Sequence, residues 1–173
     1  ISSFSTPNKV LAIFKIPLPS LVNWSGLVLA LDSINDPGNL GTIIRLCDWF
    51  GITDLVCSET TVDCYNSKVV QSSMGSHSRV NITYLDLEAT LADSKLCYGT
   101  FMGGASIYEH ELPKTGVIVM GNEANGISKE IESLITVRLS IPRFGSLKQT
   151  ESLNVANAAA IILSEFKRNI TEK

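Results

Sequence analysis

The 173-residue sequence has few of the side chains that bind metals, and their spacing is unfavourable. It contains two histidines and four cysteines, and no two cysteines form a C-x-x-C pair. Structural zinc sites use such pairs together with histidine, so we expect no metal site. Cysteines that lie in or beside apolar stretches are instead typical of reduced thiols, which predicts a cytoplasmic protein.

Long apolar runs and a strong positive charge are also missing. No apolar stretch approaches the roughly 20 residues that span a bilayer, so we expect no membrane segment. The net charge of -3 disfavours a surface built for non-specific nucleic-acid binding, although it permits a local basic patch. Neither a G-x-G-x-x-G nor a G-x-x-x-x-G-K motif occurs, which disfavours a generic nucleotide-binding domain.

What the sequence does contain is an alternation of short apolar runs with helical patterns. Runs rich in Val, Ile and Leu predict six strands, near residues 27–31, 54–57, 80–84, 96–101, 116–121 and 137–142. Helices are expected at residues 40–50, 67–73, 86–92, 129–134 and 151–166. This order predicts an α/β fold, with a mostly parallel six-stranded sheet and helices on both faces.

The first 25 residues stand apart from this alternation. Val10, Leu11 and Phe14 recur at helical spacing, which predicts a helix over residues 7–16. Prolines end that helix, and a linker is expected to follow. We therefore expect an N-terminal helix and linker at 1–25, which leaves room for a further domain upstream, and a single domain at 26–173.

A nearly apolar helix at residues 40–50 carries the first candidate site residues. Asn39 is placed to cap it. Its only polar stripe is Thr42, Arg45 and Asp48, so the helix is expected to pack on two sides, against the sheet and against a second subunit. Arg45 is open to two interpretations: an ion pair with Asp48, or a guanidinium that binds a phosphate or carboxylate.

Polar residues also gather where the last strands end. Glu123 follows strand 116–121, either as part of a simple turn or as a carboxylate at the strand's carboxyl end. Ser152 suits the N-cap of the last helix, whereas Asn154 and Asn157 lie among alanines and need hydrogen-bond partners if they are buried. Ligands of open α/β sheets bind beyond the carboxyl ends of the strands, so these loops predict a pocket.

Three blocks of this sequence resemble the signature motifs of the SpoU (TrmH-like) branch of the SPOUT RNA methyltransferases. They are Asn39–Arg45 with Gly51, Val119–Ser128, and Ile141-Pro142 with Ser152–Val155. The resemblance implies a C-terminal trefoil knot, a homodimer, bound S-adenosylmethionine, and methyl transfer to a ribose 2′-hydroxyl of RNA. Ribosomal RNA is the favoured substrate, with transfer RNA, methylation of a base nitrogen, and a catalytically silent RNA-binding dimer as alternatives.

The resemblance also implies roles for individual residues. The catalytic set would be Asn39, Arg45, Glu123, Ser152 and Asn154. Contacts to the cofactor would come from Thr100, Gly103, Gly121, Asn122, Ile141, Pro142, Leu153 and Asn154. The sequence departs from the family after Ile141-Pro142, where Arg143 replaces a common Met and the segment to Glu151 is longer. Arg143 and Lys148 would either reach RNA phosphate or form a solvated basic loop.

Overall fold

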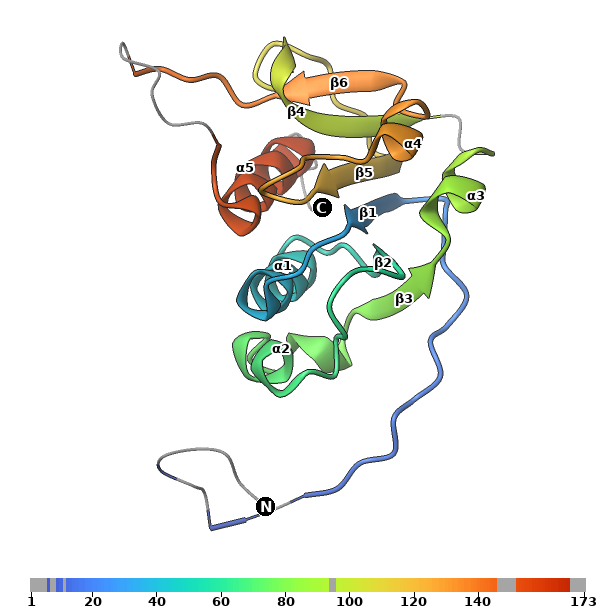
Figure 1. The fold of residues 1–173 in the computed structure, drawn as a ribbon, viewed down its shortest axis with the longest axis vertical. Helices are drawn as coiled ribbons and strands as arrows, with labels where there is room; N and C mark the ends of the chain where they lie inside the picture. Colours follow the sequence, from blue (N-terminus) through green and yellow to red (C-terminus); the bar gives the residue numbers. More distant parts are fainter. Residues whose placement is uncertain (1–5, 7–8, 11, 94–95, 146–151, 169–173) are drawn as a thin grey trace.

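The computed structural model describes residues 6, 9–10, 12–93, 96–145 and 152–168. Its six strands form one sheet in the order β3-β2-β1-β5-β4-β6, and all five neighbouring pairs are parallel (Figure 1). The strands are β1 (Leu27–Asp32), β2 (Asp54–Ser58), β3 (Asn81–Leu85), β4 (Cys97–Ser106), β5 (Gly116–Gly121) and β6 (Val137–Ser140). The expected parallel α/β sheet is confirmed.

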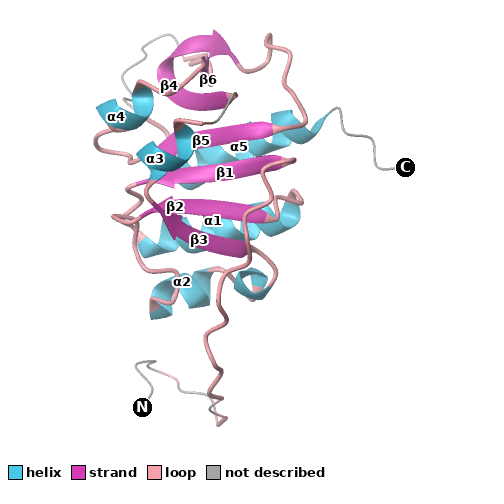
Figure 2. Ribbon diagram, turned by 90° about the vertical axis from the view of Figure 1, so that its right-hand side faces the viewer, coloured by secondary structure: helices cyan, strands magenta, loops and turns pink. Residues whose placement is uncertain are grey.

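Helices cover both faces of this sheet (Figures 1 and 2). One face carries α1 (Pro37–Trp49), α2 (Ser67–Ser72) and α5 (Val155–Arg168), and the other carries α3 (Leu87–Leu91) and α4 (Lys129–Glu132). A short 3-10 turn at Ser76–Ser78 follows α2. None of the helices in these described ranges is long and apolar enough to cross a bilayer.

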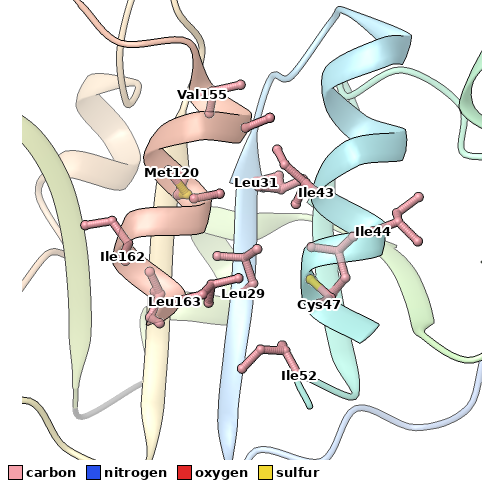
Figure 3. Close-up of a cluster of buried hydrophobic side chains, with 14 of the residues drawn as sticks. Leu29, Leu31, Ile43, Ile44, Cys47, Ile52, Met120, Val155, Ile162 and Leu163 are labelled. Atoms are coloured by element: carbon pink, nitrogen blue, oxygen red, sulfur yellow. The ribbon is translucent and has the colours of Figure 1, made fainter. Parts of the chain in front are cut away.

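The central strand β1 explains why the apolar runs are continuous rather than alternating. Leu29 and Leu31 pack towards α1 and α5, as Figure 3 shows, whereas Val28 and Ala30 belong to the cluster on the opposite face. All six residues of β1 are buried. A strand with helices on both sides has no face for polar side chains, so period-two alternation is absent.

The expected helix at residues 7–16 is wrong for every described residue in that range. Val10, Ile13 and Phe14 are 82%, 90% and 84% exposed, so their helical spacing meets no packing partner. A helix of this length is marginal in water unless an apolar face is buried. The stretch from residue 12 to β1 runs without helix or strand (Figure 1). Asn81 holds it through two hydrogen bonds with the backbone of Ser20.

Helix α1 begins earlier than expected, and a different residue caps it. Pro37 occupies the first turn, and the Asp36 carboxylate accepts the backbone N–H of Asn39 at 2.8 Å. Pro at that position needs no hydrogen-bond partner for an N–H, which explains how the helix extends to it. Asn39 therefore lies inside the first turn and its side chain is available for other contacts. Gly51 ends the helix with a φ of +63°, as expected.

Strand β4, expected only over residues 96–101, continues through residues 102–105 and ends at Ser106. Its pairing with β6 shifts register between Thr100 and Ala105, which both lie opposite Leu139. At Gly104 a Cβ atom would lie 2.7 Å from the carbonyl oxygen of Arg138, so only glycine permits this approach. Glycine at this position thus allows the strand to bulge and to continue past its expected end.

Candidate functional site

A pocket of about 1130 Å³ lies beyond the carboxyl ends of β5 and β6, beside the middle of β4 and the start of α5. Among its lining residues are seven of the eight predicted cofactor contacts: Thr100, Gly103, Gly121, Asn122, Ile141, Pro142 and Leu153. Asn154, the eighth, lies next to a lining residue but is not itself one. The structure thus brings these loops together, while their contact with a cofactor stays a prediction.

The pocket combines apolar walls with a few charged groups. Met120 on β5 and Ala158 and Ile162 on α5 line it with apolar surface. Its charged lining residues, within the described parts of the chain, are Glu123, Arg138 and Arg143. Small-molecule sites commonly have this composition, with apolar walls for ring systems and a few polar groups for orientation. S-adenosylmethionine, which has an adenine ring and a zwitterionic methionine end, fits such a lining.

Gly121, the last residue of β5, allows the loop after the strand to fold back closely. A Cβ atom at this position would lie 2.2 Å from the carbonyl carbon of Gly126, closer than any real contact. Asn122 and Gly126 exchange two backbone hydrogen bonds, of 3.0 and 2.8 Å, which close the loop. Gly126 has a φ of +72°, a conformation that favours glycine.

Residues at the end of β1 hold this loop in place. The side-chain amide of Asn122 donates to the carbonyl of Ser33 at 2.8 Å, and its oxygen accepts the N–H of Ala124. The buried carboxylate of Asp32 accepts the N–H of Ser128 at 2.7 Å. The loop that carries Glu123 is therefore anchored at both ends, which fixes the direction of its carboxylate.

A chain of hydrogen bonds joins residues from all three sequence blocks. The Asn39 side chain donates through Nδ2 to Oε1 of Glu123, and its Oδ1 accepts from Nδ2 of Asn154 at 2.8 Å. Oδ1 of Asn154 in turn accepts the backbone N–H groups of Ala156 and Asn157, at 3.0 and 3.2 Å. Asn154, and not Ser152 as expected, is therefore the residue that caps α5.

The structure changes the interpretation of the polar residues around α5. Asn154 and Asn157 are both exposed. They are therefore not the buried side chains that would require a hydrogen-bond partner within the protein. Ser152 lines the pocket and is exposed, and its side chain makes no hydrogen bond within the described residues. It is thus accessible to a ligand. The cap was misassigned because Ser and Asn are equally good caps in sequence.

A single copy of the chain does not bring Arg45 to the pocket. Arg45 is exposed on α1, six residues beyond Asn39 and therefore about 9 Å further along the helix axis. Of the two interpretations of Arg45, the ion pair with Asp48 is wrong, because Asp48 pairs with Arg79 at 2.7 Å and accepts a hydrogen bond from Ser76. These two donors lower the pKa of the Asp48 carboxyl. Arg45 itself makes no hydrogen bond or ion pair to any described residue.

Arg138 on β6 is a pocket residue that sequence reasoning missed. Its guanidinium lies 3.5 Å from the ring centroid of Phe101, and it forms an ion pair with Glu132. Nothing in the local sequence indicated that Arg138 lines a pocket, because a polar residue in a short strand is normally interpreted as facing solvent. Arg143 also lines the pocket, whereas Lys148 lies outside the described residues. The expected trefoil knot stays a prediction, because residues 146–151 lie outside the described residues as well.

The described part of the chain shows no metal-binding cluster: no three His, Cys, Asp or Glu side chains lie close enough together. The fold and the pocket together define a parallel α/β domain with a pocket at the carboxyl ends of its strands, which is where domains of this kind bind small molecules. The chain belongs to the SpoU rRNA Methylase family, whose family model matches residues 26–164. The resemblance drawn from the three sequence blocks is thereby confirmed.

Two relatives and one solved structure place the chain within this family. It is 32% identical over 173 residues to the 23S rRNA (guanosine(2553)-2′-O)-methyltransferase RlmP of Bacillus subtilis, covering 96% of this chain and 68% of the relative. It is 34% identical over 148 residues to the 23S rRNA (guanosine-2′-O-)-methyltransferase RlmB of Neisseria meningitidis, covering 82% of this chain and 58% of the relative.

The fold is that of the SpoU methyltransferase AviRb from Streptomyces viridochromogenes, solved in complex with the cofactor AdoMet. The two structures superimpose with a TM-score of 0.77 at 29% identity, over 92% of this chain and 65% of the other. The present chain therefore spans between 58% and 68% of the length of these three proteins.

Proposed function

We propose that this chain transfers a methyl group from S-adenosylmethionine to a ribose 2′-hydroxyl of RNA, and that the RNA is ribosomal. The observation that carries the proposal is the hydrogen-bonded chain from Glu123 through Asn39 to Asn154, at the edge of a pocket that suits the cofactor. The choice of ribosomal RNA is supported by relatives named as 23S rRNA 2′-O-methyltransferases.

The residues that would hold the cofactor come from the middle of β4, the ends of β5 and β6, and the start of α5. Backbone groups at Thr100, Gly121 and Ile141 would contact the adenine and ribose, and the apolar side chains of α5 would support the ring. Bound S-adenosylmethionine supplies a methyl group already activated by its sulfonium. The protein's task is therefore to orient the ribose oxygen and to help remove one proton, and orientation alone lowers such a barrier by several kcal/mol.

In this proposal Glu123, Asn39 and Asn154 are positioning residues, and Ser152 meets the substrate. Glu123 accepts from Asn39, which fixes the orientation of that amide, so its oxygen faces Asn154. Asn154 then holds the first turn of α5 against the pocket. Ser152 lines the pocket without a described partner and is available to the substrate hydroxyl.

Arg45 would bind the phosphate next to the target ribose, from the second copy of a homodimer. Arg45 lies outside the pocket of its own copy, on a helix that also exposes Trp49, which is 83% accessible. An exposed Trp beside an arginine is typical of an interface centre. Arg45 would not accept the proton, since a guanidinium hardly deprotonates. The catalytic unit would be residues 26–173, acting in the cytoplasm, where its four buried cysteines stay reduced.

The experiment is a transfer assay with the purified protein, tritiated S-adenosylmethionine and total RNA from cells that lack the protein. We expect label in ribosomal RNA, and a 2′-O-methylnucleoside after nuclease digestion and mass spectrometry. No transfer to any RNA would support the silent RNA-binding dimer instead. A methylated base, or label confined to transfer RNA, would show that the acceptor atom or the RNA has been misassigned.

A further inference from the structure

Two exposed aromatic rings lie side by side at the mouth of the pocket. Phe144 lines the pocket and is 84% exposed, and Tyr108 beside it is 42% exposed. Their ring centroids are 6.4 Å apart and their planes are tilted by 34°. Apolar rings are stabilised by leaving water, so a pair that stays exposed at a binding site is available to a ligand with a flat face.

The sheet fixes where these two rings stand. Tyr108 comes two residues after β4 ends and Phe144 four residues after β6 ends, and the two strands are paired at Ser106 and Ser140. Beyond that pair, the N–H of Ile107 donates to the carbonyl of Ser140 at 3.0 Å. The N–H of Tyr108 lies 3.3 Å from the hydroxyl of Ser106. The two rings therefore follow the ends of β4 and β6, which backbone hydrogen bonds hold together.

We propose that Tyr108 and Phe144 form a stacking platform for an unstacked nucleobase of the RNA substrate, adjacent to the ribose that receives the methyl group. The proposal rests on the proposed function, because it gives the substrate a place beside the cofactor pocket. Proteins that hold single-stranded RNA stack its bases on aromatic side chains, which tolerates any base.

The surroundings favour a base of RNA over the other flat ligand, the adenine of the cofactor. The cofactor's apolar walls lie inside the pocket, on β5 and α5, whereas Phe144 stands at its rim with most of its surface in water. Arg143, which precedes Phe144 in the sequence, also lines the pocket and contributes a positive charge to it. A cation beside an exposed ring is complementary to a nucleotide, which carries a phosphate beside its base.

The test compares Phe144→Leu and Tyr108→Leu with a matched control, Phe14→Leu. Phe14 has the same 84% exposure as Phe144 but lies in the N-terminal stretch, outside the residues that match the family. We expect the KM for RNA to rise roughly 5- to 100-fold in the two platform variants, the range of one lost base stack. The dissociation constant for S-adenosylmethionine and the melting temperature should stay at wild-type values, and Phe144→Trp should restore the KM.

A second measurement detects the contact directly. RNA substituted with 5-iodouridine cross-links on irradiation to rings that stack on it, and mass spectrometry identifies the attached peptide. We expect adducts on the peptides that contain Tyr108 and Phe144, and none on the peptide that contains Phe14. The probe is this 5-iodouridine-substituted RNA, taken from cells that lack the protein.

Three outcomes would overturn the platform. An unchanged KM for RNA in both variants would do so, as would a weakened affinity for S-adenosylmethionine alone, which would place the rings in the cofactor site. If the wild type is a dimer and both variants are monomers, the two rings belong to an interface between copies of the chain. Failure of the proposed function is distinguishable from these, because the wild-type protein would then transfer no methyl group to RNA.

Discussion

The side-chain amide of Asn154 donates a hydrogen bond of 2.8 Å to the side-chain oxygen of Asn39, a residue 115 positions earlier in the chain. The nitrogen of the same Asn39 amide donates to Glu123, so the amide accepts one hydrogen bond through its oxygen and donates another through its nitrogen. An amide can link an acceptor on one side to a donor on the other, which a carboxylate or a hydrocarbon side chain cannot do. The polarity of this chain requires amides at Asn39 and Asn154 and an acceptor at Glu123.

Two substitutions separate the capping role of Asn154 from its link to Asn39. Asn154→Ala removes both, so we expect the free energy of unfolding to fall by about 1 kcal/mol and methyl transfer to be lost. Asn154→Asp keeps a capping oxygen but replaces the donor with a second carboxylate beside the Asn39 oxygen. We expect it to retain most of the stability and to lose transfer.

Urea denaturation and the tritium assay measure the two effects. Asn157→Ala is the matched control, because Asn157 is exposed on the same helix and its side chain makes no hydrogen bond within the described residues. If Asn154→Asp transfers methyl groups at the wild-type rate, the polarity argument fails and the residue is only a cap.

Gly121→Ala tests whether the close return of the loop after β5 shapes the pocket. The added methyl would lie 2.2 Å from the backbone of Gly126, so the loop must move away. Forcing an extra methyl into packed structure costs about 1–3 kcal/mol, and the shifted loop would no longer line the pocket in the same way. We expect a lower melting temperature and an affinity for S-adenosylmethionine weakened by roughly tenfold or more.

Gly26→Ala is the control for this experiment, because a Cβ atom at Gly26 meets nothing within 4 Å. Isothermal titration calorimetry with S-adenosylmethionine measures the affinity of both variants. Wild-type binding by Gly121→Ala would show that the pocket described here is not where the cofactor binds.

The sequence predicted the sheet well, because the strands are mostly short apolar runs set off by turn residues, and the central strands β1 and β5 are buried on both sides. Even so, it did not reveal that the Asn39 side chain joins Glu123 to Asn154 and does not cap α1. That role depends on Glu123 and Asn154, which are 84 and 115 positions away, and local spacing carries no information on such distances. The N-terminal helix failed for a related reason. Its periodicity was present, but Ile13 and Phe14 have no surface to pack against.

The ion pair between Asp48 and Arg79 should make stability depend on pH in a specific window. Hydrogen bonds from Arg79 and Ser76 lower the pKa of Asp48 in the folded protein, so the folded state binds its proton less readily than the unfolded state. The stabilisation is therefore full above the unfolded pKa of about 3.9 and is lost as the pH falls through the folded value.

Urea denaturation of the wild type and of Asp48→Asn between pH 7 and pH 3 measures this effect. We expect a difference at pH 7 that shrinks below about pH 4. In an Arg79→Met background the same substitution should have a smaller effect and a weaker pH dependence. A difference between wild type and Asp48→Asn that is constant across the range would contradict the assignment.

Arg45→Ala should abolish methyl transfer while binding of S-adenosylmethionine survives, because Arg45 lies outside the pocket that suits the cofactor. Loss of one preorganised charged donor typically lowers turnover by roughly 100-fold or more. Arg45→Lys keeps the charge but not the two-pronged geometry, so we expect intermediate activity. Wild-type turnover by Arg45→Ala would remove Arg45 from the site.

Mixing two inactive variants determines which copy supplies Arg45. If Arg45 acts on the partner's pocket, a mixed dimer of Arg45→Ala and Asn154→Ala has one site with both defects and one intact site. Equal mixing, followed by exchange of subunits, makes half of the dimers mixed, so turnover should return to roughly a quarter of the wild-type value. If Arg45 serves its own pocket, every site keeps one defect and mixing restores nothing. The same tritium assay on the mixture separates the two outcomes, because neither variant alone is expected to turn over.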